Sequence, residues 1–139
     1  MSAAGVGIVE LGDVCAALRA RSLDLFEVTG AWVFDTTDAA QQRWFAEASH
    51  RHAWHAELWA GRSPLIPVID ADALVDRHRG RPDAVDVDVE HRADSYRGWL
   101  DELLEHLDEV ERRIVAELDP ATTRAITLTS ADLVDLRSR

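Results

Sequence analysis

The chain has 139 residues, 47% of them hydrophobic and 29% charged, which is typical of one soluble globular domain with a single core. Its formal net charge of −11 argues against a nucleic-acid backbone as a partner, because phosphate contacts need clustered cations. No run of about 18 apolar residues is present and the start lacks a signal-peptide pattern, so we expect a cytoplasmic protein, one domain over residues 1–139, without a membrane span.

Residues 8–34 are predicted to form a long first helix. One apolar stripe repeats at spacings of three and four, and a second stripe from Ala16 to Phe34 lies on another side, which favours burial on two sides. Glu27 lies within this second stripe, where a carboxylate without a partner is costly. The single cysteine, Cys15, cannot form an internal disulfide, which fits a reducing compartment, and we interpret it as a packing residue.

Residues 38–61 are predicted to form the second helix, with Asp38 as its N-cap and Gly61 as its stop. Within it, Glu47 and His50 are three residues apart and therefore project from one face. Glu-x-x-His at this spacing places two ligands inside the helix bundles of di-iron and di-manganese carboxylate proteins, although the bare pattern also occurs by chance.

Two further histidines, His52 and His55, follow on the same predicted helix. They share a face with Phe45, Ala48 and Trp59. We interpret them as packing residues or as hydrogen-bond donors that support a ligand.

The connection between the first two helices is short, which predicts that they are antiparallel neighbours. Folding the chain there brings position 27 level with position 46, so Glu27 is expected to face Glu47 and His50. Three such groups at one level are costly unless a cation or full hydrogen bonding satisfies them. The pattern therefore favours a metal site, and a buried polar cluster that sets the helix register is the alternative.

Residues 62–90 differ in character, because three prolines and one glycine interrupt any regular pattern. A short helix over Asp70–Arg79 is compatible with this composition. A plain loop of this length is unusual. The segment instead suits the crossover of a helical bundle, which joins the second helix to the third.

Residues 91–118 show the clearest amphipathic pattern, with an apolar stripe from Tyr96 to Leu118 at spacings of three and four. Glu111 and His106 flank this stripe and are its candidates for inward polar groups. Asp119-Pro120 is expected to end the helix and to start the next one.

The tail predicts a fourth helix over residues 121–137 that is short or irregular. The segment Ile126-Thr127-Leu128-Thr129 has poor helix propensity. Ser130 offers an alternative N-cap for a still shorter final helix.

The runs LFEVTGAW in the first helix and HRHAWHAELWAGRSP in the second resemble the ferritin-like di-iron carboxylate superfamily, and more closely its bacterial hydroxylase-like branch, which includes tRNA-hydroxylase-type proteins. The resemblance implies an all-α, ferritin-like four-helix bundle with a long crossover between helices 2 and 3. It also implies two iron ions, with manganese as an alternative, that activate dioxygen. It assigns metal ligation to Glu27, Glu47 and His50.

The second half of the chain departs from this family pattern. In the family, the third helix supplies a Glu and the fourth a second Glu-x-x-His, but no Glu-x-x-His follows residue 61 here. Glu111 is then the candidate ligand from the third helix. Asp132, three residues before Asp135, is the candidate from the fourth, and an aspartate pair without an imidazole lowers affinity for iron-like metals.

Three functional hypotheses follow from these patterns. The first is a metal-dependent, di-iron oxidoreductase or hydroxylase-like enzyme that acts on a small substrate with dioxygen. The second is a catalytically degenerate ferritin-like subunit or interaction module that binds one metal or none. The third is a homodimer that completes its site or core across a two-fold axis.

Overall fold

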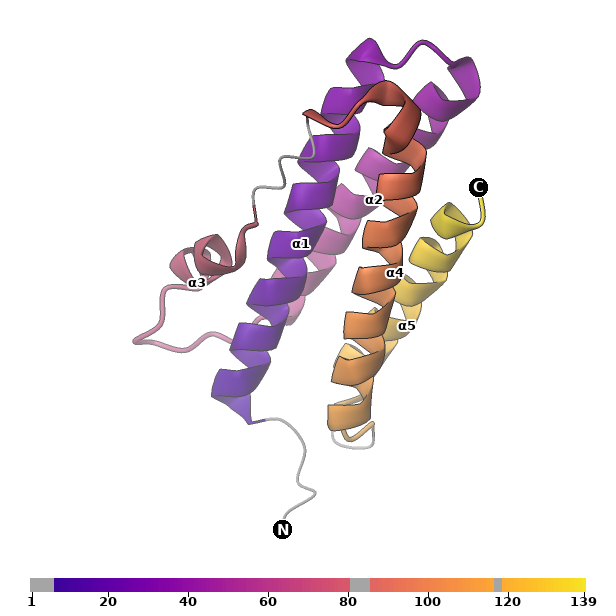
Figure 1. Cartoon of the computed structure of the whole chain (residues 1–139). Coiled ribbons are helices and arrows are strands. Elements are labelled where there is room, and N and C mark those ends of the chain that lie inside the picture. Colours follow the sequence, from indigo (N-terminus) through magenta and orange to yellow (C-terminus); the bar gives the residue numbers. More distant parts are fainter. Residues whose placement is uncertain (1–6, 81–85, 117–118) are drawn as a thin grey trace.

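The computed structural model describes residues 7–80, 86–116 and 119–139, and this part of the chain is helical without any strand. It forms five helices, α1 (Ile8–Asp35), α2 (Ala39–Arg62), α3 (Ala71–His78), α4 (Val89–Arg113) and α5 (Pro120–Arg137) (Figure 1). The predicted all-α class is therefore confirmed for the described residues. None of these helices is both long and apolar enough to cross a membrane.

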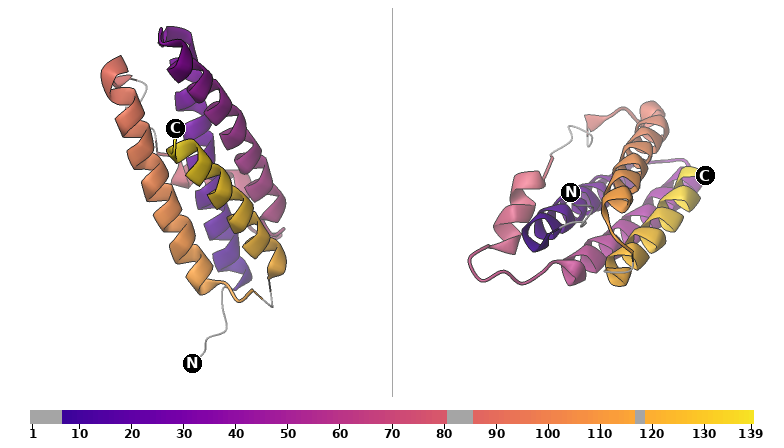
Figure 2. Two further views of the ribbon diagram at one scale, coloured as in Figure 1. Left: turned by 90° about the vertical axis from the view of Figure 1, so that its right-hand side faces the viewer. Right: turned by 90° about the horizontal axis from the view of Figure 1, so that it is seen from below.

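The four long helices lie alongside one another, and α3 packs on the outer side of α1 (Figures 1 and 2). α1 and α2 form an antiparallel hairpin, and so do α4 and α5. α2 and α4 both start at the end of the molecule where α1 ends, so the connection between them returns along the length of the helices. α5 lies between α2 and α4 on the side away from α3.

The core lies between the two hairpins and draws on all four long helices. Its largest fully buried side chains are aromatic, namely Trp32, Trp59, Tyr96 and Phe45. The Trp44 and Tyr96 rings meet edge to face with centroids 5.1 Å apart, an arrangement that aromatic pairs prefer. Cys15 is also fully buried, which confirms its predicted role in packing, and burial raises the pKa of its thiol to about 11.

The helix ends follow most of the predicted signals. Asp38 accepts a hydrogen bond from the Gln41 amide at 2.9 Å, and Asp119 accepts one from the Thr122 amide at 3.1 Å, so both are N-caps. Pro120 occupies the first turn of α5, as expected. The expected stop at Gly61 is off by one residue, since α2 continues to Arg62.

In the second half, the predicted span 121–137 of the fourth helix agrees with α5 to within one residue, but the predicted end of the third helix and the alternative N-cap at Ser130 were wrong. α4 ends at Arg113 and not at 118, and residues 117–118 lie outside the described part of the chain. α5 is one continuous helix of 18 residues, and Ser130 lies inside it and not at its start. Burial of Ile126 and Leu133 outweighs the weak propensity of this segment.

The second apolar stripe of α1 is covered over only part of its length. Ala16 and Ala20 are buried under Val75 of α3. Phe34, at the far end of the stripe, is 91% exposed. The prediction that the whole stripe is buried was wrong, because its cover is the eight-residue α3, which is too short to reach the later turns of α1.

Candidate functional site

Glu27 does not face α2, so its predicted meeting with Glu47 and His50 was wrong. Its side chain is 59% exposed, and its carboxylate accepts a hydrogen bond from Arg79 at 2.6 Å. Arg79 follows α3 directly and also donates to Asp24 at 2.6 Å. The carboxylate is therefore satisfied by the crossover on the outer side of α1.

The predicted alignment of α1 and α2 along their length, with position 27 opposite position 46, was nevertheless close to the observed one. The Ser49 hydroxyl of α2 donates to the Phe26 carbonyl of α1 at 3.0 Å, so positions 26 and 49 lie side by side. The error is one of rotation, because α2 turns Ser49 toward α1 and directs its Glu-x-x-His pair elsewhere.

Glu47 and His50 lie on the outer surface of α2. The Glu47 carboxylate accepts hydrogen bonds from Arg51 at 2.8 Å and from Arg139 beyond α5. The bond from Arg139, supported by the charge of Arg51, holds the pKa of Glu47 below its usual range. His50 is exposed. The two residues therefore share a helix but no inward-facing site.

The two candidates from the second half lie in different places. Asp132 of α5 reaches α2, where its carboxylate bonds to His55 Nε2 at 2.7 Å and lies 3.6 Å from Arg51. Glu111 is exposed in the last turn of α4. Glu27, Glu47, His50, Glu111 and Asp132 are thus not brought together, and a di-metal group does not fit these residues as they are placed.

A different pair of α2 residues, His52 and His55, is among the polar side chains buried inside the four-helix bundle. Both are fully buried, which confirms the interpretation that they pack inward. His52 Nε2 shares a hydrogen bond with the Tyr96 hydroxyl of α4 at 2.6 Å, and the two imidazole centroids are 5.9 Å apart. With the bond from His55 to Asp132, this pair connects α2 to both α4 and α5.

Burial keeps both of these imidazoles neutral near pH 7. It lowers the pKa of His52 to about 3, helped by the nearby His55 and Arg51. It also lowers the pKa of His55, and this effect exceeds the opposing influence of Asp132. Each ring has a buried Nδ1 without a hydrogen-bond partner in the described structure.

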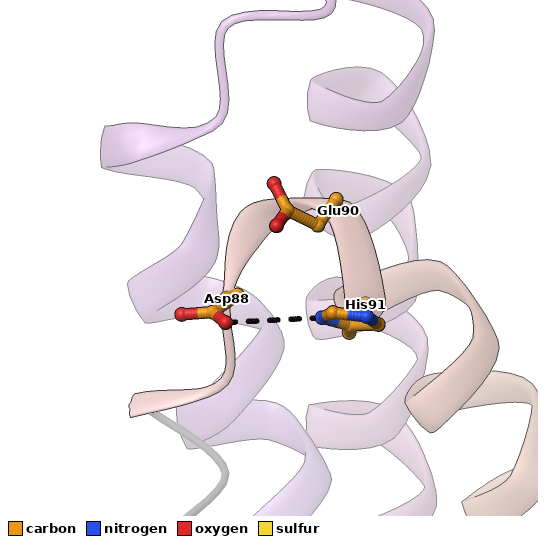
Figure 3. Close-up of side chains that lie close together, drawn as sticks. All are labelled: Asp88, Glu90 and His91. Atoms are coloured by element: carbon orange, nitrogen blue, oxygen red, sulfur yellow. Dashed lines mark ion pairs between the residues drawn. The ribbon is translucent and has the colours of Figure 1, made fainter.

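Neutral imidazoles are common metal ligands, but these two are not part of a ready ligand set. Among the residues that the structure describes, one group brings three ligand atoms within 4.8 Å of one another, and it consists of Asp88, Glu90 and His91 at the start of α4. The Asp88 carboxylate lies 3.8 Å from His91 Nδ1, and Figure 3 shows this pair with Glu90 beside it. All three are exposed, and such surface groups are common without a metal.

Arg51 is at the centre of an ion-pair network between α2 and α5. Its guanidinium donates to Glu47 and to Asp135, each at 2.8 Å, and lies near Asp132. Arg139 closes the network by bonding to Glu47 and Asp135. These arginines pair with Glu47 and Asp132, two of the carboxylates that the sequence suggested as ligands, and with the neighbouring Asp135.

The sequence indicated that the face of α2 with His52 and His55 packs inward, but it also placed Glu47 and His50 inward, which was wrong. The apolar neighbours Phe45, Ala48 and Trp59 were the signal that placed His52 and His55 inside. Their bonds to Tyr96 and Asp132 join residues 44 and 77 positions apart, and no local pattern indicates such pairs.

Comparisons with known proteins yield no similarity on which a family assignment could rest. No protein-family model matches the chain, and no curated protein or solved structure matches it significantly.

Proposed function

We propose that this chain is a ferritin-like helical bundle that works as a binding or interaction module, without a di-metal centre in its interior. The order of the helices supports the ferritin-like part of this proposal. Two antiparallel hairpins joined by a long crossover, with the second and third long helices parallel, is the connectivity of ferritin-like bundles.

The observation that carries the proposal is that the candidate ligand carboxylates already have hydrogen-bond partners within the protein. Glu27 accepts its hydrogen bond from Arg79 on the outer side of α1, whereas Glu47 and Asp132 lie beside Arg51 between α2 and α5 and bond to Arg51 and His55 respectively. A bound metal pair would require these contacts to break and the side chains to move across helix faces. The di-iron oxygenase hypothesis is therefore less well supported than the binding-module hypothesis.

The metal content of the protein tests this proposal. The protein is purified without chelator, incubated with excess Fe(II) or Mn(II) without oxygen, desalted and analysed for bound metal. We expect well below one ion per chain and no rise in the melting temperature, since no prepared ligand set gains from the metal.

Three variants make the outcome interpretable. Loss of residual metal in His91→Asn would trace it to the exposed group at the start of α4. About two ions per chain that disappear in both Glu47→Gln and His50→Gln would instead support the di-iron oxygenase and refute the binding-module proposal.

A further inference from the structure

A concavity of about 490 Å³ lies between α2 and α4, beside the last residue of the chain. Its walls include three arginines, Arg43, Arg97 and Arg139, and one acid, Glu47. Its volume lies within the range of small-molecule sites, which is about 300–1,000 Å³. It is separate from the imidazole pair in the core.

The single acid does not neutralise the three arginines. Both Glu47 oxygens already accept hydrogen bonds from Arg139, and Arg51 donates to one of them as well. Arg43 is exposed and forms no ion pair with any residue that the structure describes. Arg97 has one ion pair, a 3.7 Å contact with the well-exposed Asp94, besides a hydrogen bond to the main-chain oxygen of Arg139. Arg139 is paired with Asp135 as well as with Glu47, so the positive charge of the hollow comes from Arg43 and Arg97, on a chain whose formal charge is −11.

The wall of this hollow is held in place by contacts within the protein. The Trp44 indole is buried and its Nε1 donates to the Leu136 carbonyl at 3.0 Å. The Arg97 guanidinium lies over the Trp44 ring at 4.9 Å and donates to the Arg139 carbonyl at 2.8 Å. A stacked, tethered guanidinium loses little freedom when it binds an anion.

We propose that this concavity binds a small organic anion, with its oxyanion held by Arg43 and Arg97 and its apolar part against Ala40 and Ala93. Guanidinium groups bind phosphate and carboxylate oxygens through paired hydrogen bonds. The two alanines and Trp44 supply the apolar part of the lining. The site uses none of the core imidazoles, and the two arginines proposed to hold the anion, Arg43 and Arg97, are not among the candidate metal ligands.

Titration with phenyl phosphate tests this site. Calorimetry measures the affinity, and the NMR resonance of the Trp44 indole N–H reports where the ligand binds. We expect saturable binding and a shift of the Trp44 signal. Benzoate and inorganic phosphate, titrated separately, distinguish a carboxylate preference from a phosphate preference and measure the contribution of the ring.

Removing a guanidinium should weaken binding at least about tenfold in Arg43→Gln and in Arg97→Gln, because each removes a charge-assisted hydrogen bond. Arg124→Gln, at an exposed position of α5, is the matched control and should bind as the unmodified chain does. Arg43 is exposed, so its variant should keep its helicity by circular dichroism.

Two results would overturn the proposal. One is the absence of saturable binding by phenyl phosphate, benzoate and inorganic phosphate at millimolar concentration. The other is an equal loss of affinity in Arg43→Gln and in the Arg124→Gln control, which would indicate only general attraction to surface charge. Neither result depends on the metal content.

Discussion

At the level of single residues, the two buried imidazoles help to set the rotation of α2 about its axis. Each is fully buried, yet each keeps one hydrogen bond to another helix, His52 to Tyr96 and His55 to Asp132. A buried polar group that loses its partner costs about 1–3 kcal/mol. Rotating α2 would break both bonds, so this pair favours one rotation over others.

The buried His52 predicts a stability that falls in mild acid. Its folded pKa is about 3 and its ordinary value is 6.5, so between these values the unfolded chain binds a proton that the folded chain does not. The free energy of unfolding should therefore decrease as the pH falls through this window. From pH 7.5 to 5.5 we expect a loss of about 1.4 kcal/mol from this residue, measured by urea unfolding.

Substitution separates this residue from the other titrating groups. His52→Gln should remove that part of the pH dependence, while His50→Gln, at an exposed position of the same helix, should retain it. An identical dependence on pH in both variants would show that His52 does not stay neutral in the folded state.

The same helix shows how far spacing alone can define a site. Glu47 and His50 are three residues apart, and so are His52 and His55, and both pairs therefore share a face by helix geometry. Which pair points inward depends on the rotation of α2 against three other helices. The apolar residues beside His52 indicated the inward face, but the resemblance to a metal-binding pattern favoured the other pair.

At the level of helices, α3 explains why one side of α1 is partly covered. Val75 packs on Ala16 and Ala20 in a small cluster of its own, separate from the main core. An isolated helix of eight residues is marginal in water, so α3 depends on this contact. The sequence predicted both the short helix and the stripe on α1, but nothing in it showed that one covers the other.

Val75→Asp should release α3 while leaving the four long helices folded. The new carboxylate would be buried against two alanines, which is unfavourable without a partner. Hydrogen exchange should show protection of the α3 amides reduced at least about tenfold, with the α2 and α5 amides unchanged. Val68→Asp, at a 92% exposed position of the same connection, is the matched control.

The final helix shows tertiary packing overriding local propensity. Thr127 and Thr129 each direct a hydroxyl to the carbonyl four residues earlier, a bond that is compatible with a helix but does not favour it. The buried faces of Ile126, Leu133 and Leu136 supply the stabilisation. The N-cap at Asp119 could be predicted because it is local, whereas the continuity of α5 depends on contacts with α2 and α4.

At the level of the whole molecule, long helices with regular apolar stripes allowed the all-helical class to be predicted from sequence. How the two hairpins meet could not be predicted, because the contacts join distant residues. Arg92 is the clearest example. It is only 4% exposed and lies over the Trp32 ring at 5.3 Å. It therefore attaches the start of α4 to the end of α1.

Four hydrogen bonds make this attachment specific. The Arg92 guanidinium donates to both carboxylate oxygens of Asp35, at 2.7 and 3.1 Å, and to Thr36 at 3.2 Å. It also donates to the Val87 carbonyl at 3.1 Å. One side chain thus connects the turn of the first hairpin, the end of the crossover and the start of the second hairpin.

Arg92→Ala should lower the free energy of unfolding by about 2–3 kcal/mol, because it removes charge-assisted hydrogen bonds together with the packing of the side chain on Trp32. Arg92→Lys should recover only part of the loss, since a lysine lacks the planar fork that spans two carboxylate oxygens. Arg112→Ala, at an exposed position of α4, should change stability by less than about 0.5 kcal/mol. Urea unfolding of the three variants measures these differences, and equal stability of Arg92→Ala and Arg112→Ala would show that the hairpins associate through apolar contacts alone.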